Sequence, residues 1–568
     1  MTTPPSVREK YRQLLERHVS EWLLPLARGR RGGMNVHRAA LGWPAAYLAT
    51  VDMGFGRCFG SRELLDFAVS CGDGFYRKFV RDGRQSRPSE HFSNTFFVDL
   101  YGQMRDRLTP GRRRRWGEAV LVHCRTLDDA LRVKFSAPTK GRTALEIGCG
   151  PNHVYLWCAM LYRGGQILNR PDFRRRARSA MGKLLEGLSS HGHHPEHRGP
   201  AMQYHTITTS GLATYYHLSR DRRCLEPLRR AARFYCRTIY PDLSSVEVFD
   251  ERSRWHPNYA FGAHGALCRI PMGRRYIELA LDRLLSGGGR GHWRKAGVPT
   301  GWLLRALLQY EDGPRAPLPV ESRRVALRLG AEGLMRRTGP WFHALSAFCN
   351  EPWEYNPYIL DRIQNLSCWH EKTGLIIGGG NDKSCPEAAT FYALEGGEVG
   401  YYRPRRARIV RAGDGDRVEL DYGPILASLS VRPRGPGCMS ISADLRHWVL
   451  YLKPTLNLQL QLKPGIIGLA RGRTARLSGS PHRPQRIATG GLIRTASWEL
   501  HGPPGMMLRW PHLPSTMRTG RKEPDVADAV GIATVPLPDD GGHVDLELRI
   551  RSRSRGASDV LDAPDFLS

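Results

Sequence analysis

Residues 218–240, LSRDRRCLEPLRRAARFYCRTIY, decide the fold class of the first half of this chain. A polar turn opens the segment, and apolar side chains then recur at spacings of three and four: Leu225, Leu228, Ala232 and Tyr235. That spacing puts them on one stripe of an amphipathic helix, opposite a basic face. The segment therefore predicts a helix with one buried side, starting near Glu226.

The same layout occurs at residues 163–185 and 55–79, where helices are expected to start near Pro171 and Ser61. The copies at 163 and 218 lie about 54 positions apart, a length that fits one helical hairpin. Repeated hairpins cannot bury their apolar faces alone, so they stack into a solenoid or close into a ring. We expect a domain of helical hairpins over residues 1–345, either a solenoid or a closed ring.

In the last third of the chain the sequence pattern changes to short runs in which β-branched and polar residues alternate. They include RARIVRAG, RVELDYG, ILASLSVRP, CMSISADL, NLQLQLKPG and HVDLELRIR, separated by Gly, Pro and Asp clusters. This pattern is typical of an antiparallel sandwich. The prediction is an α+β multidomain chain with a junction at 346–385 and a β-sandwich at 386–568.

Composition limits the partners. The formal charge of +31 favours an anionic partner such as nucleic acid, acidic lipid or acidic polysaccharide. Arginine far outnumbers lysine, a skew that a GC-rich genome also produces. Apart from residues 112–115 and 174–176 the arginines are scattered with few aromatics between them, so nucleic-acid binding is not expected.

The cysteine spacing and the lengths of the apolar segments argue against several kinds of site and location. The twelve cysteines form no CxxC pair, which argues against a zinc ribbon or a disulfide framework, and we expect buried, reduced thiols. No segment has the length of a membrane span, and the amphipathic start of the chain lacks the apolar core of a signal peptide. A cytoplasmic location, no cofactor and no membrane contact are the expectations. The oligomeric state stays open, with a homodimer as one option.

The segment TALEIGCGPNH, residues 143–153, resembles the glycine-rich first motif of S-adenosylmethionine-dependent methyltransferases. A basic helix start follows it where such a domain would continue into a second strand with an acidic end. We therefore interpret it as a loop that enters a helix, which puts Asn152 and His153 at the head of that helix. Asn152 alone could simply be an N-cap residue.

A second polar pair, Tyr204 and His205, opens the helical segment after the loop HGHHPEHRGP at residues 191–200. The histidines of that loop could hold a metal, but its turn-like composition favours a solvated loop. Two such pairs on neighbouring hairpins could line one pocket with an amide, a phenol and imidazoles. For His205 the alternative is a residue turned away from the pocket that packs its helix.

These residues resemble those of the heparinase II/III-like and alginate lyase families of polysaccharide lyases. The motifs are PNH at 151–153, EHRGPAMQYH at 196–205 and WHEKTGLIIGGGNDKSCPEAATF from 369. The resemblance implies a toroid followed by a β-sandwich, and cleavage of uronate-containing glycans by β-elimination. In the family the sandwich adds a histidine to the cleft, and His370 stands where that residue would be expected.

The implied chemistry can be assigned to particular residues. Asn152 and His153 would neutralise the uronate carboxylate, with His370 or Arg198 assisting, while Tyr204 would serve as base and acid and His205 as the alternative base. Glu196 would orient a histidine or Arg198. Further residues could bind the sugar chain, with ordinary packing as the alternative for each: Trp255, Asn258, Tyr259, His264 and Tyr355.

Two other classes of function remain as alternatives. Helical toroids also carry glycoside hydrolases, which use paired carboxylates, and non-catalytic glycan-binding proteins. The clear carboxylate candidates beside the segments above are few: Glu196, Asp250, Glu251 and Glu354. The hydrolase therefore ranks below the lyase, and the methyltransferase ranks third.

Overall fold

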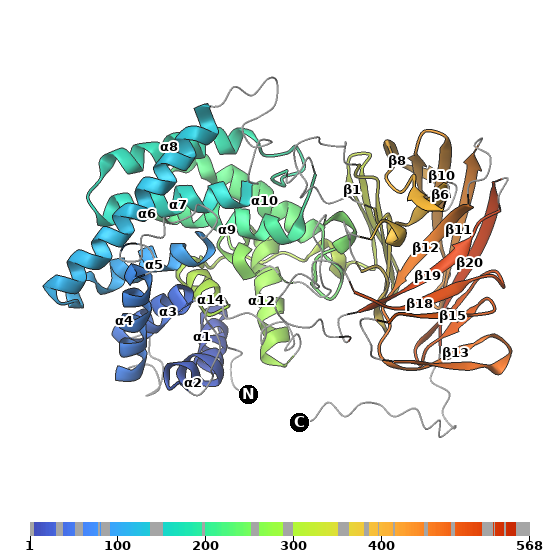
Figure 1. Cartoon of the computed structure of the whole chain (residues 1–568), viewed down its shortest axis with the longest axis horizontal. Coiled ribbons are helices and arrows are strands. Elements are labelled where there is room, and N and C mark those ends of the chain that lie inside the picture. Colours follow the sequence, from blue (N-terminus) through green and yellow to red (C-terminus); the bar gives the residue numbers. More distant parts are fainter. Residues whose placement is uncertain are drawn as a thin grey trace. The chain divides into compact units, whose positions relative to one another are not determined.

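The structure is a computed structural model of the whole chain (Figure 1). It describes residues 5–29, 38–51, 61–77, 80, 91–136, 151–195, 199–250, 259, 261–287, 299–349, 363–379, 385–395, 397–412, 415–447, 453–478, 483–513, 526, 529–538 and 541–551. The chain divides into two compact units. Unit 1 comprises residues 1–198, 203–236 and 259–318, and unit 2 comprises 199–202, 237–258 and 319–568.

Unit 1 is helical. Its helices are α1 (Val7–His18), α2 (Leu24–Ala27), α3 (Arg38–Thr50), α4 (Arg62–Tyr76), α5 (His91–Met104), α6 (Pro110–Ser136), α7 (Pro151–Ile167), α8 (Pro171–Glu186), α9 (Met202–Ser219), α10 (Leu225–Arg237), α11 (His264–Leu267), α12 (Pro271–Leu285) and α14 (Pro299–Gln309). In the described part of the chain, no helix combines the length and apolarity that crossing a bilayer requires.

The expected helix starts are confirmed to within one residue. Pro171 begins α8, where its fixed φ and missing N–H suit the first turn. Ser61 caps α4, its hydroxyl accepting from the amide of Leu64. Helix α10 begins at Leu225 and buries Leu228, Ala232 and Tyr235. Local capping signals and apolar spacing thus determine where these helices start.

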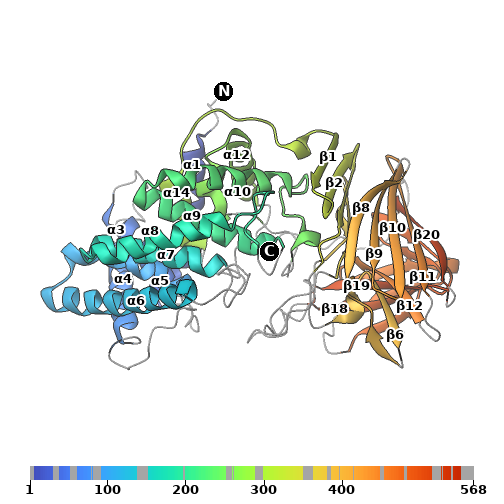
Figure 2. The ribbon, with the colours of Figure 1, turned by 90° about the horizontal axis from the view of Figure 1, so that it is seen from above.

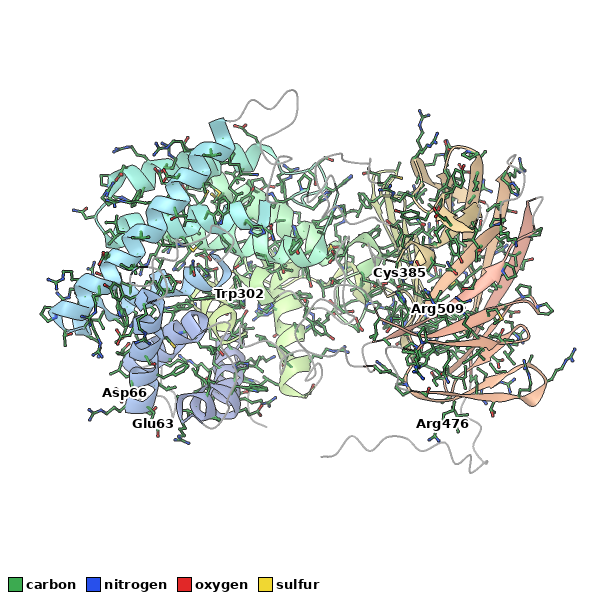
Figure 3. The ribbon with its side chains drawn as sticks, in the orientation of Figure 1. Glu63, Asp66, Trp302, Cys385, Arg476 and Arg509 are labelled. Atoms are coloured by element: carbon green, nitrogen blue, oxygen red, sulfur yellow. The ribbon has the colours of Figure 1, made fainter. Side chains whose placement is uncertain are left out.

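The first helix of unit 1 packs against its last ones. The Tyr11 hydroxyl lies 2.6 Å from Nδ1 of His264 in α11, and Lys10 pairs with Asp282 of α12 at 2.6 Å. Trp302 of α14, labelled in Figure 3, belongs to the same unit. Its ring meets that of Phe96 of α5 edge-on, with centroids 5.5 Å apart. Contacts between the ends of the helical segment close it into a ring of hairpins, the predicted toroid.

Unit 2 contains two antiparallel sheets (Figure 1). The first runs in the order β1-β2-β3-β4-β5-β12-β19-β18-β15, with β6 paired to β12 and β7 paired to β6. Its strands are β1 (Arg324–Leu329), β2 (Gly333–Thr338), β3 (Trp341–Ser346), β4 (Leu366–His370), β5 (Gly374–Ile377), β6 (Phe391–Glu395), β7 (Glu398–Gly400), β12 (Lys453–Leu460), β15 (Gln485–Ala488), β18 (Met507–His512) and β19 (Val530–Pro536).

The second sheet runs in the order β14-β13-β16-β17-β20-β11-β10-β9-β8. Its strands are β8 (Arg406–Ala412), β9 (Gly415–Asp421), β10 (Ile425–Gly435), β11 (Cys438–His447), β13 (Gly465–Leu469), β14 (Thr474–Leu477), β16 (Leu492–Arg494), β17 (Trp498–His501) and β20 (Gly542–Ile550). Alternate residues of β9 are buried, as the sequence alternation predicts. One apolar core draws on both sheets, and Leu429, Ile441, Leu458 and Trp510 belong to it.

The sheet unit begins earlier than the boundary expected at residue 345. Strands β1 to β3 occupy residues 324–346, joined by short turns. All six residues of β3 are buried, and its sequence WFHALS does not alternate between polar and apolar residues. The sequence pattern therefore does not distinguish it from the helices before it.

Unit 2 also includes a segment from the helical half of the sequence, residues 237–258. Within it, the Tyr240 hydroxyl donates to Glu247 Oε2 at 2.7 Å and lies 2.6 Å from Ser367 Oγ of β4. Phe249 meets the ring of Phe348 with centroids 6.0 Å apart. The two units are therefore not consecutive pieces of the chain.

The methyltransferase interpretation is wrong. The segment after the glycine-rich string is α7, which turns back into α8, and both belong to a helical unit. No strand is assigned among the described residues before Arg324, so the parallel sheet that a nucleotide-binding domain needs is not found there.

Candidate functional site

Helices α7 and α9 lie side by side, and α8 connects them along the chain (Figure 2). They run in the same direction, because their contacts keep one offset along the sequence. Three contacts join them at a nearly constant offset of 52 to 55 positions. Gln166 donates to the carbonyl of Leu218 at 3.4 Å, the rings of Tyr162 and Tyr215 meet edge-on at 5.4 Å, and Gly211 lies against the backbone of Leu156. The offset agrees with the repeat predicted from the sequence.

This register brings the two polar pairs to the same end of the hairpins. Extending the offset places Asn152 level with residues 204–207 of α9, the turn that carries Tyr204. Asn152 also lies one turn before Leu156, and Tyr204 lies two turns before Gly211. Residues at these spacings share a helix face, so Asn152 is on the side of α7 that meets α9, and Tyr204 is on the side of α9 that meets α7.

Asn152 and His153 occupy the first turn of α7. Asn152 is only 1% exposed, and its Oδ1 accepts from the amide of His153 at 2.9 Å. This contact satisfies one of the free amides of the first turn, so Asn152 does part of what a capping residue does. The His153 side chain is partly buried, with its ring 6.5 Å from that of Trp157.

Behind the polar pairs, three rings connect α7 to α9. The Tyr155 hydroxyl donates to the carbonyl of Leu184 at 2.8 Å and lies 3.0 Å from Nδ1 of His194. The ring of His194 in turn lies 6.4 Å from that of His205. Because the phenol's proton goes to the carbonyl, Nδ1 of His194 is the donor to Tyr155. Sequence reasoning missed this connection.

His205 is 2% exposed and faces away from solvent. Its Nε2 donates to the carbonyl of Ala231 at 3.1 Å, and its ring packs against Phe234. Burial lowers the pKa of His205 to about 4. The pKa of His194 is well below its ordinary value, mainly through burial and then through the nearby His205. Both rings are therefore neutral near pH 7, and the packing alternative fits His205 better than the role of a base.

Two of the loop histidines are not solvated, contrary to expectation. His193 and His194 are both buried, and His193 lies against Phe234. In the part of the chain that the structure describes, no three His, Cys, Asp or Glu side chains gather closely enough to hold a metal ion. The composition of the loop is that of a turn, but the neighbouring helices cover it.

His370 ends β4 in unit 2 and is 2% exposed. Its Nε2 donates to the carbonyl of Pro436 at 3.1 Å, its Nδ1 accepts from the amide of Lys372 at 3.1 Å, and its ring packs on Trp341. Both ring nitrogens are therefore used within the sandwich. These contacts give His370 a packing role there.

The expected sugar-binding residues are only partly described. His264 is buried in α11, bonded to Tyr11, which makes it part of the core. Tyr259 is partly buried, and the guanidinium of Arg283 lies 5.8 Å from the centre of its ring. The remaining candidates lie outside the described residues: Glu196, Arg198, Trp255, Asn258 and Tyr355.

The electrostatics of this end of the toroid come from the backbone. Helices α7 and α9 both begin here, and a helix carries partial positive charge at its first turn, where amides are free. Two parallel helix starts side by side favour an anionic group. With the amide of Asn152, the imidazole of His153 and the phenol of Tyr204, the site can hold a carboxylate and move a proton beside it.

Comparison with protein-family models finds no match to this sequence. No curated protein matches it either. Solved structures do match. Heparinase III aligns with a TM-score of 0.54 at 11% identity, over 90% of this chain and 76% of that one. Chondroitin AC lyase of Streptomyces coelicolor A3, solved in complex with chondroitin sulphate, aligns with a TM-score of 0.54 at 14% identity, over 97% and 80%. The resemblance predicted from the sequence is thus confirmed at the level of the fold: the chain has the toroid-plus-sandwich fold of these two polysaccharide lyases.

Proposed function

We propose that this protein is a lyase that cleaves uronate-containing anionic glycans by β-elimination. The observation that carries the proposal is the register of α7 and α9, which brings Asn152, His153 and Tyr204 to one end of two parallel helices. The fold agrees with it, since both structures compared above are polysaccharide lyases. The formal charge of +31 suits an anionic substrate.

The β-elimination reaction determines which chemical groups the site must supply. β-Elimination removes the proton at C5 of the uronate and expels the oxygen linked at C4, which leaves an unsaturated sugar. The C5 proton is barely acidic while the adjacent carboxylate is charged. The first turn of α7 supplies hydrogen-bond donors for that carboxylate from Asn152 and His153, and these donors stabilise the developing enediolate.

Tyr204 is the proposed proton carrier. As a phenolate it would take the C5 proton, and as a phenol it would return a proton to the leaving oxygen, so atoms and charge balance over the turnover. His205 is a poorer base, because its pKa of about 4 is far from the working pH and its ring is buried. His370 is left out of the proposal because both its ring nitrogens are bonded inside the sandwich.

A Tyr204→Phe substitution tests the proposal. It should lower kcat by about 10²- to 10⁴-fold, the usual contribution of an acid–base group, with the fold intact. The assay incubates the protein with heparan sulfate, chondroitin sulfate, hyaluronan and alginate, and follows the ultraviolet absorbance of the conjugated double bond. Tyr216→Phe is the matched control, because it removes a hydroxyl from the other end of the same helix.

Three outcomes would count against the proposal. If no glycan gives the absorbance, the protein is not a lyase of these substrates. Reducing ends released without the absorbance would indicate a hydrolase instead. Full activity of Tyr204→Phe would remove Tyr204 from the mechanism.

A further inference from the structure

A basic pocket lies on the helical unit, in a part of the molecule that the proposed reaction does not use. It is a surface cavity of about 540 Å³ between α8 and the turn that follows α9. Five arginines line it with two serines and one carboxylate, that of Asp221: Arg175, Arg178, Arg220, Arg222 and Arg223. The sequence run at residues 174–176 contributes its middle member to this pocket.

The local sequence explains how these side chains come together. Arg175 and Arg178 are three residues apart on α8 and so share one face, which Gly182 continues one turn further. A Cβ on Gly182 would lie 3.2 Å from a guanidinium nitrogen of Arg223. The missing side chain therefore lets Arg223 lie along α8, where it donates to the carbonyl of Arg178 at 3.4 Å.

The turn after α9 positions the remaining arginines. Arg220 has a left-handed backbone, with φ of 54°, and reverses the chain. Asp221 then caps a short 3₁₀ helix, Arg222–Cys224, by accepting from the amide of Arg223. The same carboxylate pairs with the Arg223 guanidinium at 2.6 Å. Asp221, the one acid among the described lining residues, is thus used in holding the turn.

The pocket carries an excess of positive charge. Five guanidinium groups against one carboxylate give a formal charge of +4. Among the described residues no carboxylate pairs with Arg175, Arg178, Arg220 or Arg222, whereas elsewhere on α8 Arg176 pairs with Asp128 at 3.1 Å. Like charges held this close repel each other in the absence of an anion.

The lining favours one class of anion. Guanidinium groups bind sulfate and carboxylate oxygens with paired, charge-assisted hydrogen bonds, and hydroxyl groups add neutral ones. Among the described residues that line the pocket none is aromatic, so they offer no surface on which nucleic-acid bases could stack. These groups suit the sulfate or carboxylate groups of an anionic glycan.

The pocket is separate from the candidate catalytic end. Tyr204 is in the first turn of α9 and Arg220 follows its last residue, so about 24 Å along the helix axis separates them. We propose that this basic pocket is an exosite that binds an acidic segment of a glycan chain away from the point of cleavage. The choice of a glycan as partner rests on the proposed function.

The double variant Arg175→Ala/Arg178→Ala tests the exosite. Both residues are exposed on α8, so the fold should be retained. We expect affinity for a fluorescent heparin oligosaccharide to fall about ten- to a hundredfold, because charge-assisted hydrogen bonds are lost. The salt dependence of binding should also become shallower, since fewer counterions are released. Arg113→Ala/Arg114→Ala is the matched control: it removes the same charge from exposed positions of α6 and should change affinity less than about twofold.

The readout is equilibrium binding, so the test holds even if the protein has no lyase activity. A single-stranded DNA of equal charge is measured in parallel. The exosite proposal is contradicted if the α8 variant loses no affinity. It is also contradicted if both double variants lose the same affinity, because binding then depends on the overall charge and not on this pocket. If DNA binds more tightly than heparin and only the α8 variant loses this binding, the partner of the pocket is a nucleic acid and not a glycan. If the lyase reaction is found, the α8 variant should raise KM for long chains and leave kcat unchanged.

Discussion

Buried histidines make the stability of unit 1 depend on pH. Burial lowers the pKa of His205 and His18 to about 4, and of His123 and His264 to about 3. Between pH 6.5 and pH 4 the unfolded chain therefore binds protons that the folded chain does not, and acid favours unfolding. Each such histidine contributes a slope of up to about 1.4 kcal/mol per pH unit.

A His205→Gln substitution should remove one of these contributions. The glutamine amide can still donate to the carbonyl of Ala231, but it does not titrate. Denaturant unfolding measured from pH 7 to pH 4.5 should show a free energy that falls less steeply than in the wild type, by about 1.4 kcal/mol per pH unit at most. An unchanged slope would show that His205 is not a neutral, buried group.

His543 affects the pH dependence of stability in the opposite direction. It is on β20, and hydrogen bonds to Asp444 and Asp545 raise its pKa. A raised pKa stabilises the fold below the unfolded value, and this contribution is lost as the pH rises. Replacing His543 by Gln should therefore make the loss of stability on acidification steeper.

For single residues, the sequence predicts which polar side chains are site candidates better than it predicts the contacts that those side chains make. Asn152 and Tyr204 stand out because polar residues open two apolar helical segments. The burial of His194 and its bond to Tyr155 depend on α8 and α10 covering a loop of turn-like composition. Side chains brought together by distant segments leave no local pattern, so this connection could not be predicted.

Gly211 sets how closely α7 and α9 approach. A Cβ on it would lie 2.9 Å from the backbone of Leu156 and of Tyr155, atoms that cannot move without shifting a whole helix. The absent side chain therefore fixes the distance between the two helices that carry the candidate site.

Gly211→Ala should destabilise unit 1 by about 1–3 kcal/mol, the usual cost of overpacking, despite the better helix propensity of alanine. It should also lower kcat of the proposed reaction, because α9 carries Tyr204 away from α7. Thermal unfolding and the elimination assay measure the two effects. Gly74→Ala, in α4, is the control: only the tip of Arg77 is near it, so it should stabilise by about 0.5–1 kcal/mol. Equal effects of the two substitutions would contradict the tight contact at Gly211.

Elements with local signals could be predicted from the sequence. Alternation identified β8 to β12 and β20, and proline or serine marked the starts of α8 and α4. Strand β3 gave no such signal, because a fully buried run is equally compatible with a helix. The order of strands in the two sheets depends on pairings between distant segments, which periodicity does not encode.

At the scale of the whole molecule, the sheet unit contains a segment from the helical half of the sequence. Tyr240 and Phe249 come from the helical half of the sequence, yet they are fully buried in the sheet unit against Phe342 and Phe348. A fragment that begins at residue 319 would lack them and expose the apolar surface they cover.

We expect fragment 319–568 to unfold at lower denaturant than the same fragment with a peptide of residues 237–250 added. Each aromatic side chain that the peptide buries should contribute about 1.5–3 kcal/mol. Binding of a hydrophobic dye to the fragment should fall as the peptide is titrated in. A peptide with Tyr240→Ala and Phe249→Ala is the control and should have little effect. A fragment that is equally stable with and without the peptide would show that the segment is not part of its core.

The parallel pairing of α7 and α9 has a consequence for how such a protein can evolve. Both polar pairs follow directly on connecting segments, while the helices behind them are held by Gly211 and the rings of Tyr162 and Tyr215. Residues inserted at exposed positions of those connections leave these contacts unchanged and cost little in loop entropy. Descendants of one gene could thus acquire new substrates by lengthening or shortening two loops, with the ring of helices inherited unaltered.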